Sequence, residues 1–197
     1  RKLLSLVEDE NTGEILVEDL HTEIPEHRLK ETETLVSILG DEVVQEFPWK
    51  NDMKPSTNDK VEGVLRRTWR PALSIVGSDG LPPTANAGNV LRPYTTLQLS
   101  MRIPPMVDAK NARDAIKKKL TESIPYEASV KLHFEEAADG WNAPETSPWL
   151  IKAIEKASEN YFDEKPCSIS EGGTIPFMAM LGERFPKAQF VITGVLG

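Results

Sequence analysis

The chain has 197 residues, of which 39% are hydrophobic and 27% are charged, a composition typical of a soluble globular protein and unlike that of disordered or fibrous chains. Its formal net charge of -8 argues against a dominant nucleic-acid-binding surface, because such surfaces are basic. The single cysteine, Cys167, excludes an internal disulfide, and no apolar run approaches the roughly 20 residues that cross a bilayer. These features predict a cytoplasmic protein that binds neither nucleic acid nor membranes.

Both ends of the chain predict a segment of a longer protein. It starts without methionine inside an amphipathic run, residues 1–7, and it stops directly after an apolar run of the buried-strand type, residues 189–193. Natural termini more often trail off in polar residues.

Residues 1–69 predict a flanking segment with little chemistry. A helix end is expected over residues 1–7 and a short extended stretch over 14–17, after the turn Asn11-Thr12-Gly13. The spacing of Leu35, Leu39 and Val43 predicts a second helix within 31–47, and residues 48–60 are expected to form a loop.

Residues 70–136 predict an α+β domain, an antiparallel sheet backed by helices. A strand is expected over 70–77, and residues 95–103 alternate in a way that predicts a half-buried strand, with Leu97, Leu99, Met101 and Ile103 on its apolar face. Asp108 is expected to cap a helix whose buried stripe is Ala112, Ile116 and Leu120. Another alternating strand is expected over 129–134.

Residues 137–197 predict an α/β segment from a second domain. Ser147 and Pro148 are a helix start, and the expected buried stripe of that helix is Leu150, Ile154, Ala157 and Tyr161. A short helix from Pro176 and a buried strand over 189–193 follow, an order typical of a parallel sheet covered on both faces.

Two features are candidates for ligand binding, and each also has a purely structural interpretation. The first is the stretch SEGGTIP, residues 170–176, in which Thr174 can simply cap a helix. Alternatively, Gly172 and Gly173 expose backbone N–H groups that bind an anionic group, while the carboxylate of Glu171 binds a cationic one, so that the turn suits a zwitterion. Arg102 lies on the polar face of its strand, where it is either solvated or positioned to bind a carboxylate.

Nothing in the sequence predicts a metal site. The three histidines, His21, His27 and His133, do not have metal-ligand spacing, and Cys167 belongs to no recognisable motif.

Five stretches taken in order resemble the zinc-dependent exopeptidases and amidohydrolases related to carnosinase-type dipeptidases, acetylornithine deacetylase, succinyl-diaminopimelate desuccinylase and the glutamate carboxypeptidases. The stretches are RPALSIVGSDG, NVLRPYTTLQLSMRIPP, GW, SEGGTIPFM and QFVITGVLG, within residues 65–197. The resemblance implies a lid or dimerisation domain, an antiparallel sheet with two helices on one face, inserted into a split catalytic domain. It places the lid core at 70–136 and part of the second catalytic half at 137–197.

The resemblance also implies roles for individual residues. Arg102 matches a lid arginine that binds the terminal carboxylate of the substrate, usually from the partner subunit, and Asn89 matches a lid position near the same substrate. Glu171 matches a glutamate that faces the substrate amine, and the turn Gly172-Gly173-Thr174 matches the one that holds its carboxylate.

The parent enzyme implied by the resemblance is a homodimer that binds two zinc ions and hydrolyses dipeptides. Its metal ligands and general base match no position of this chain, so the fragment itself is expected to bind no zinc and to be inactive. Two other functions stay open: an amidohydrolase acting on N-acyl amino acids, and a non-catalytic module for dimerisation or small-molecule binding.

Overall fold

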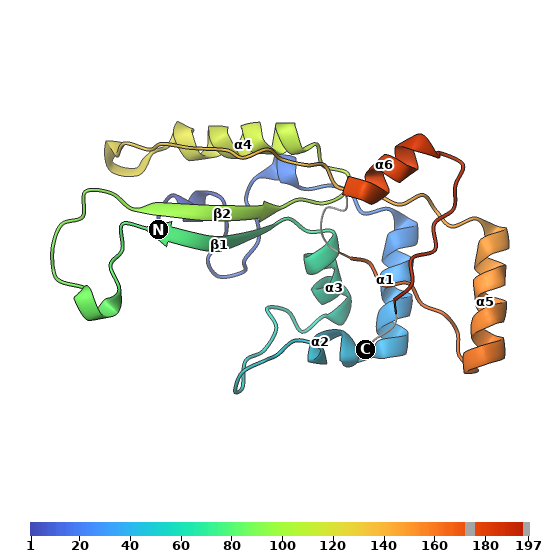
Figure 1. The fold of residues 1–197 in the computed structure, drawn as a ribbon. Helices are drawn as coiled ribbons and strands as arrows, with labels where there is room; N and C mark the ends of the chain where they lie inside the picture. Colours follow the sequence, from blue (N-terminus) through green and yellow to red (C-terminus); the bar gives the residue numbers. More distant parts are fainter. Residues whose placement is uncertain (172–175, 195–197) are drawn as a thin grey trace.

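The computed structural model of the chain describes residues 1–171 and 176–194, the side chain of Pro176 excepted. Its elongated middle is a β-hairpin, with strand β1 (Ala72–Asp79) antiparallel to strand β2 (Thr96–Arg102). Ala72 pairs with Arg102 at one end and Asp79 with Thr96 at the other, with a bulge between Ile75 and Gly77. In Figure 1 the loop that joins the strands lies at one end of the molecule and helices α5 and α6 lie at the other.

Helix α4 (Ala109–Glu122) lies along the hairpin and covers its apolar face together with the N-terminal residues. Asp108 caps this helix as predicted, because its carboxylate accepts a hydrogen bond from the backbone N–H of Asn111 at 2.7 Å. Leu73, Met101 and Ile103 pack against the buried cluster, which consists of Val7, Ile15, Val17, Leu20, Val107, Ala112 and Leu120. The α+β class is therefore confirmed. The N-terminal segment, which includes the 3₁₀ turns η1 (Leu4–Leu6) and η2 (Glu18–Leu20), contributes Val7, Ile15, Val17 and Leu20 to its core.

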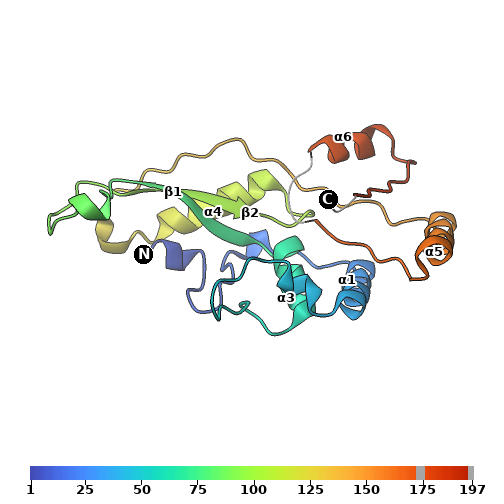
Figure 2. The same cartoon turned by 60° about the horizontal axis from the view of Figure 1, so that its bottom comes forward.

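A second cluster joins three helices beside the end of the sheet (Figure 2), namely α1 (Glu26–Leu39), α2 (Glu42–Gln45) and α3 (Lys60–Thr68). One helix was expected over 31–47, but Gly40 has a φ of 57°, a conformation that ends α1 and lets the chain turn before α2. Helix α3 was not predicted, although Asp59 caps it by accepting hydrogen bonds from the N–H groups of Val61 and Glu62.

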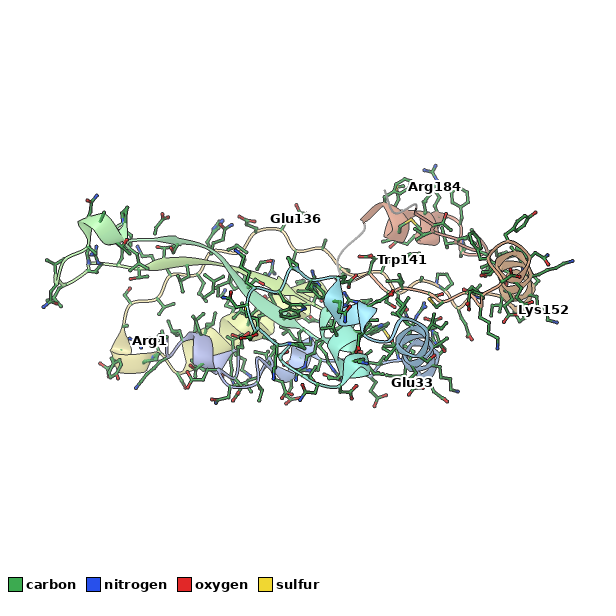
Figure 3. All side chains as sticks on the ribbon, turned by 90° about the horizontal axis from the view of Figure 1, so that it is seen from below. Arg1, Glu33, Glu136, Trp141, Lys152 and Arg184 are labelled. Atoms are coloured by element: carbon green, nitrogen blue, oxygen red, sulfur yellow. The ribbon has the colours of Figure 1, made fainter. Side chains whose placement is uncertain are left out.

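The C-terminal part consists of α5 (Pro148–Phe162) and α6 (Pro176–Arg184), joined to the rest through few contacts. The ring centroid of Trp141 lies 5.3 Å from that of Phe190, and Gly182 lies directly against the Trp141 indole. Arg28 donates to the carbonyl of Ala143 at 2.5 Å. Figure 3 shows Trp141 between the body of the molecule and these two helices.

Three predicted features of the second half differ from the structure. Residues 129–134 and 189–193 run extended but join no sheet, because neither stretch has a strand to pair with among the described residues. The predicted stripe on α5 is not buried: Tyr161 is 83% exposed, and no residue of this helix is fully covered. The division at residue 136 stays a prediction.

Short 3₁₀ turns complete the element order, η3 (Thr84–Asn86) in the hairpin loop and η4 (Pro125–Glu127) after α4. Across residues 1–171 and 176–194, none of the helices has both the length and the apolar character that crossing a membrane requires.

Candidate functional site

Arg102 is the last residue of β2, and the end of α3 holds its side chain. Its Nη1 donates to the carbonyl oxygen of Arg67 at 2.9 Å. This carbonyl belongs to the last turn of α3, where backbone oxygens have no partner within the helix and the helix dipole favours a cation. The guanidinium is therefore held on one side by a backbone that cannot neutralise its charge.

Arg102 also differs from the neighbouring arginines in having no acidic partner among the described residues. Arg67 pairs with Glu46, and Arg70 pairs with Glu62 at 3.1 Å. Arg102 is exposed, and its remaining N–H donors are available to a ligand. A planar guanidinium with free donors is the side chain best matched to a carboxylate.

Asn89 lies at the opposite end of the hairpin from Arg102. It belongs to the exposed loop over residues 80–95, which connects Asp79 to Thr96. Arg102 is seven residues beyond the last residue of this loop, at the other end of β2, where it pairs with Ala72. Seven strand residues span about 23 Å. Figure 1 shows this loop pointing away from α3 and α6, so one chain does not bring Asn89 and Arg102 together.

Glu171 is exposed and follows Cys167, which packs against the α1–α3 cluster. The other three predicted residues of the turn, Gly172, Gly173 and Thr174, lie outside the described residues. Helix α6 begins just after them, and in Figures 1 and 2 its start lies at the same end of the sheet as the end of β2. The structure therefore brings the region of Glu171 to the same end of the hairpin as Arg102.

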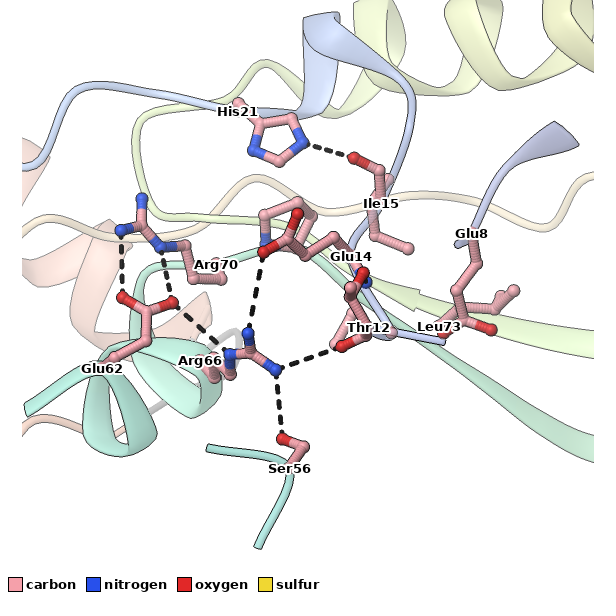
Figure 4. A pocket seen from close by; sticks show the side chains of 13 residues that line it. Glu8, Thr12, Glu14, Ile15, His21, Ser56, Glu62, Arg66, Arg70 and Leu73 are labelled. Atoms are coloured by element: carbon pink, nitrogen blue, oxygen red, sulfur yellow. Dashed lines mark hydrogen bonds and ion pairs between the residues drawn. The ribbon is translucent and has the colours of Figure 1, made fainter. Parts of the chain in front are cut away.

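A polar cavity of about 490 Å³, which the sequence did not predict, opens beside α3 (Figure 4). Arg66 lies at its centre and donates to the carbonyl of Thr12 at 3.2 Å and to the hydroxyl of Ser56 at 3.1 Å. Glu62 lies between the guanidinium groups of Arg66 and Arg70, at 3.4 Å and 3.1 Å. The four-residue spacing of Glu62, Arg66 and Arg70 on one helix was the signal for this network.

Both arginines of this cavity pair with glutamates of its lining, Arg66 with Glu14 and Glu62 and Arg70 with Glu62, so we assign it a structural role. Its hydrogen bonds tie α3 to the N-terminal hairpin, in which Glu8 bridges to Ile15, and to the loop around Ser56. Because the carbonyl of Arg67 on α3 holds Arg102, the cavity network supports the position of the candidate ligand-binding arginine.

The described residues do not fit a metal ion. No group of three or more histidine, cysteine, aspartate or glutamate side chains within 1–171 and 176–194 is arranged to hold one. The Nε2 atom of His21 lies 2.7 Å from the carbonyl oxygen of Ile15, an interaction that orients the ring toward the backbone. No chemical step is therefore assigned to a metal held by this part of the chain.

Comparisons with known proteins agree with the resemblance seen in the motifs. Over 126 residues the chain is 23% identical to a cysteinylglycine-S-conjugate dipeptidase of Corynebacterium striatum, a match covering 64% of this chain and 28% of that protein. The fold matches human carnosine dipeptidase 1 with a TM-score of 0.65 and 21% identity, over 94% of this chain and 40% of the other. No family model matches the chain.

Two further solved structures have the same fold. One is the dipeptidase Dug1p from Saccharomyces cerevisiae, with a TM-score of 0.65 and 19% identity over 93% of this chain and 38% of that protein. The other is an M20 family metallo-carboxypeptidase from Sulfolobus solfataricus, with a TM-score of 0.62 and 15% identity over 94% and 41%. The chain therefore has the fold of part of these metallopeptidases, and it spans well under half of their length.

Proposed function

We propose that this chain is the lid and substrate-positioning part of a longer metallopeptidase that hydrolyses dipeptides. The proposal is supported by a fold shared with two dipeptidases and a carboxypeptidase. The single observation that carries it is Arg102, a guanidinium held by a backbone carbonyl and without an acidic partner among the described residues. In this proposal the metal ions, two zinc ions, are held by residues outside this chain.

Arg102 binds the terminal carboxylate of the substrate, and the turn at 171–174 binds its other groups. Glu171 faces the free amine, and the N–H groups of Gly172 and Gly173, with the hydroxyl of Thr174, contribute to holding the carboxylate. These residues take no part in bond cleavage. They increase the rate by fixing the orientation of the substrate, which reduces the entropic cost of the reaction.

The geometry of the hairpin favours a homodimer through the lid domain. A dipeptide extends over roughly 7 Å. Asn89 lies beyond one end of β2 and Arg102 is the residue at its other end, and the strand itself is about 23 Å long. Both residues can bind one dipeptide only if they come from different chains. We therefore propose that the loop carrying Asn89 reaches the substrate bound at Arg102 of the partner subunit.

The proposed location is the cytoplasm, because the chain carries a single free cysteine and Cys167 is half-buried against the α1–α3 cluster. A reducing compartment is consistent with this absence of disulfides.

Co-expression of two variants tests the whole proposal. In the full-length protein, Asn89→Ala and Arg102→Ala are each expected to lose most dipeptidase activity as homodimers. A mixed dimer has one complete site, formed by Arg102 of the first variant and Asn89 of the second, and one site lacking both groups. Random pairing makes half of the dimers mixed, so co-expression is expected to restore about one quarter of the wild-type activity.

Four results would contradict parts of the proposal. If co-expression restores no dipeptidase activity, Asn89 and Arg102 act within one chain. If each single variant is as active as the wild type, neither residue belongs to the site. Turnover of N-acyl amino acids in place of dipeptides would favour the amidohydrolase alternative. Absence of any hydrolysis, with dimers still forming, would favour a non-catalytic dimerisation module.

A further inference from the structure

The loop that joins β1 to β2, residues 80–95, carries a single charged side chain. Although the whole chain has a net charge of -8, Arg92 is the only charged residue in this loop. Arg92 is exposed, and it takes part in none of the ion pairs found in the described part of the chain. The local charge of the loop is therefore positive, and its guanidinium has no acidic partner among the described residues.

Arg92 lines a shallow depression of about 310 Å³ where the loop joins the strands, and the other walls of this depression are mainly apolar. The lining residues are Gly80, Leu81, Pro82, Arg92, Pro93 and Tyr94. Leu81 is 57% exposed and Tyr94 is 62% exposed, so the apolar walls are open to a ligand. Apolar walls beside one guanidinium suit a side chain that has methylene groups and ends in a carboxylate.

The backbone around the depression has few alternative conformations. Gly80 has a φ of 80°, and a Cβ at this position would lie 2.5 Å from the carbonyl oxygen of Tyr94, so only glycine lets the two sides of the loop approach this closely. The rings of Pro82 and Pro93 each fix φ. The walls are therefore held in place before a ligand arrives, which lowers the entropic cost of binding.

The depression lies close in the chain to Asn89, the loop residue of the candidate site. Arg92 follows Asn89 by three residues, which span at most about 10 Å, and its long side chain can close much of this distance. The inference rests on the proposed function, in which Asn89 reaches a dipeptide bound at Arg102 of the partner subunit. A loop in that position also brings Arg92 within reach of a side chain of the dipeptide.

The charges of a dipeptide decide which side chain suits the depression. Its terminal carboxylate binds Arg102 and its amine faces Glu171, so its main chain has no further charge to pair with Arg92. An apolar side chain in the depression would cover the guanidinium without pairing it, which is unfavourable. We propose that the depression is a specificity pocket for an aspartyl or glutamyl side chain, and that Arg92 determines a preference for dipeptides that contain one.

Pairs of dipeptides that differ only in one side-chain charge test this pocket in the full-length protein. The pairs are alanyl-glutamate with alanyl-glutamine, and glutamyl-alanine with glutaminyl-alanine. In one pair the wild type is expected to have a kcat/KM about 10- to 100-fold higher for the acidic member, as one charge-assisted hydrogen bond provides. The pair that shows this ratio identifies the residue of the substrate whose side chain enters the pocket.

Variants of Arg92 separate a role in specificity from a role in folding. Arg92→Gln is expected to bring the ratio close to unity. Arg92→Glu is expected to reverse the preference, so that the dipeptide with lysine in place of glutamate is hydrolysed faster than the acidic one. The matched control is Arg113→Gln, which should keep the wild-type ratio because Arg113 lies on α4 and pairs with Asp114.

Three results would overturn the inference. If the wild type hydrolyses dialanine but shows equal kcat/KM values within both pairs, the pocket assignment is wrong while the proposed function stands. If Arg92→Gln keeps the wild-type ratio but its dimer dissociates at higher protein concentrations, Arg92 belongs to the subunit interface and not to a pocket for substrate. A wild type that hydrolyses no dipeptide would contradict the proposed function and this inference with it.

Discussion

Replacement of Arg102 by alanine in the full-length protein gives the sharpest test of the site. A guanidinium that binds a carboxylate through two charge-assisted hydrogen bonds contributes about 3–6 kcal/mol, since each such bond is worth about 1.5–3 kcal/mol. Because each 1.36 kcal/mol corresponds to a factor of ten, kcat/KM for a dipeptide is expected to fall by roughly 10²- to 10⁴-fold. Arg102→Lys keeps the charge without the planar fork, so its loss should be intermediate.

The substrate provides the control that separates binding of the carboxylate from a structural effect. A dipeptide amide has no terminal carboxylate, so the wild type should hydrolyse it slowly and Arg102→Ala should change its kcat/KM little. Folding should tolerate the variant, because Arg102 is exposed and its hydrogen bond to Arg67 contributes only about 1 kcal/mol. Arg113→Ala is the matched control, because Arg113 lies on α4 and pairs with Asp114 at 3.4 Å.

Steady-state kinetics on both substrates decide the matter. Equal losses on the dipeptide and on its amide would show that Arg102 acts on the fold and not on the carboxylate. An unchanged kcat/KM on the dipeptide would remove Arg102 from the site altogether.

Three further predictions concern the fold of this chain. Leu20→Ala should lower the free energy of unfolding by about 2–5 kcal/mol in denaturant titrations, because Leu20 is 0% exposed. The control Met53→Ala, at a side chain that is 64% exposed, should change the free energy of unfolding by less than about 0.5 kcal/mol. Gly80→Ala should destabilise the hairpin by about 1–3 kcal/mol, because Gly80 has a φ of 80° and an added Cβ would lie 2.5 Å from the carbonyl oxygen of Tyr94. A thermal melt unchanged from that of the wild type would contradict this prediction. Hydrogen bonds from the backbone of Thr12 and Asn11 lower the pKa of Asp9. The ionised carboxylate therefore stabilises the turn at pH values above the unfolded-state pKa, and this stabilisation is lost as the pH falls through the lower folded-state pKa. A titration of the Asp9 carboxyl by NMR would detect the lowered pKa.

Local sequence signals predicted much of the hairpin and of helix α4. Alternation identified β2, and the Asp108 cap together with the stripe of Ala112 and Leu120 identified α4, because capping and periodicity act within a few residues. Helix α3 was missed because its strongest start signal, Asp59, adjoins a polar stretch that was assigned to a loop. The predicted strands at 129–134 and 189–193 were wrong for the described chain, since a strand also needs a partner that local pattern does not supply.

For the candidate site, the amino-acid sequence by itself determined the candidate residues: the guanidinium of Arg102 and the carboxylate of Glu171 from their chemistry, and the amide of Asn89 from the family resemblance. Only the tertiary structure decided how they are arranged. It places a helix carbonyl against Arg102, leaves that residue without an acidic partner among the described residues, and separates Asn89 from it along the hairpin. The physical reason is that side-chain chemistry is a property of single residues, whereas proximity depends on strand register and on contacts between segments far apart in the chain.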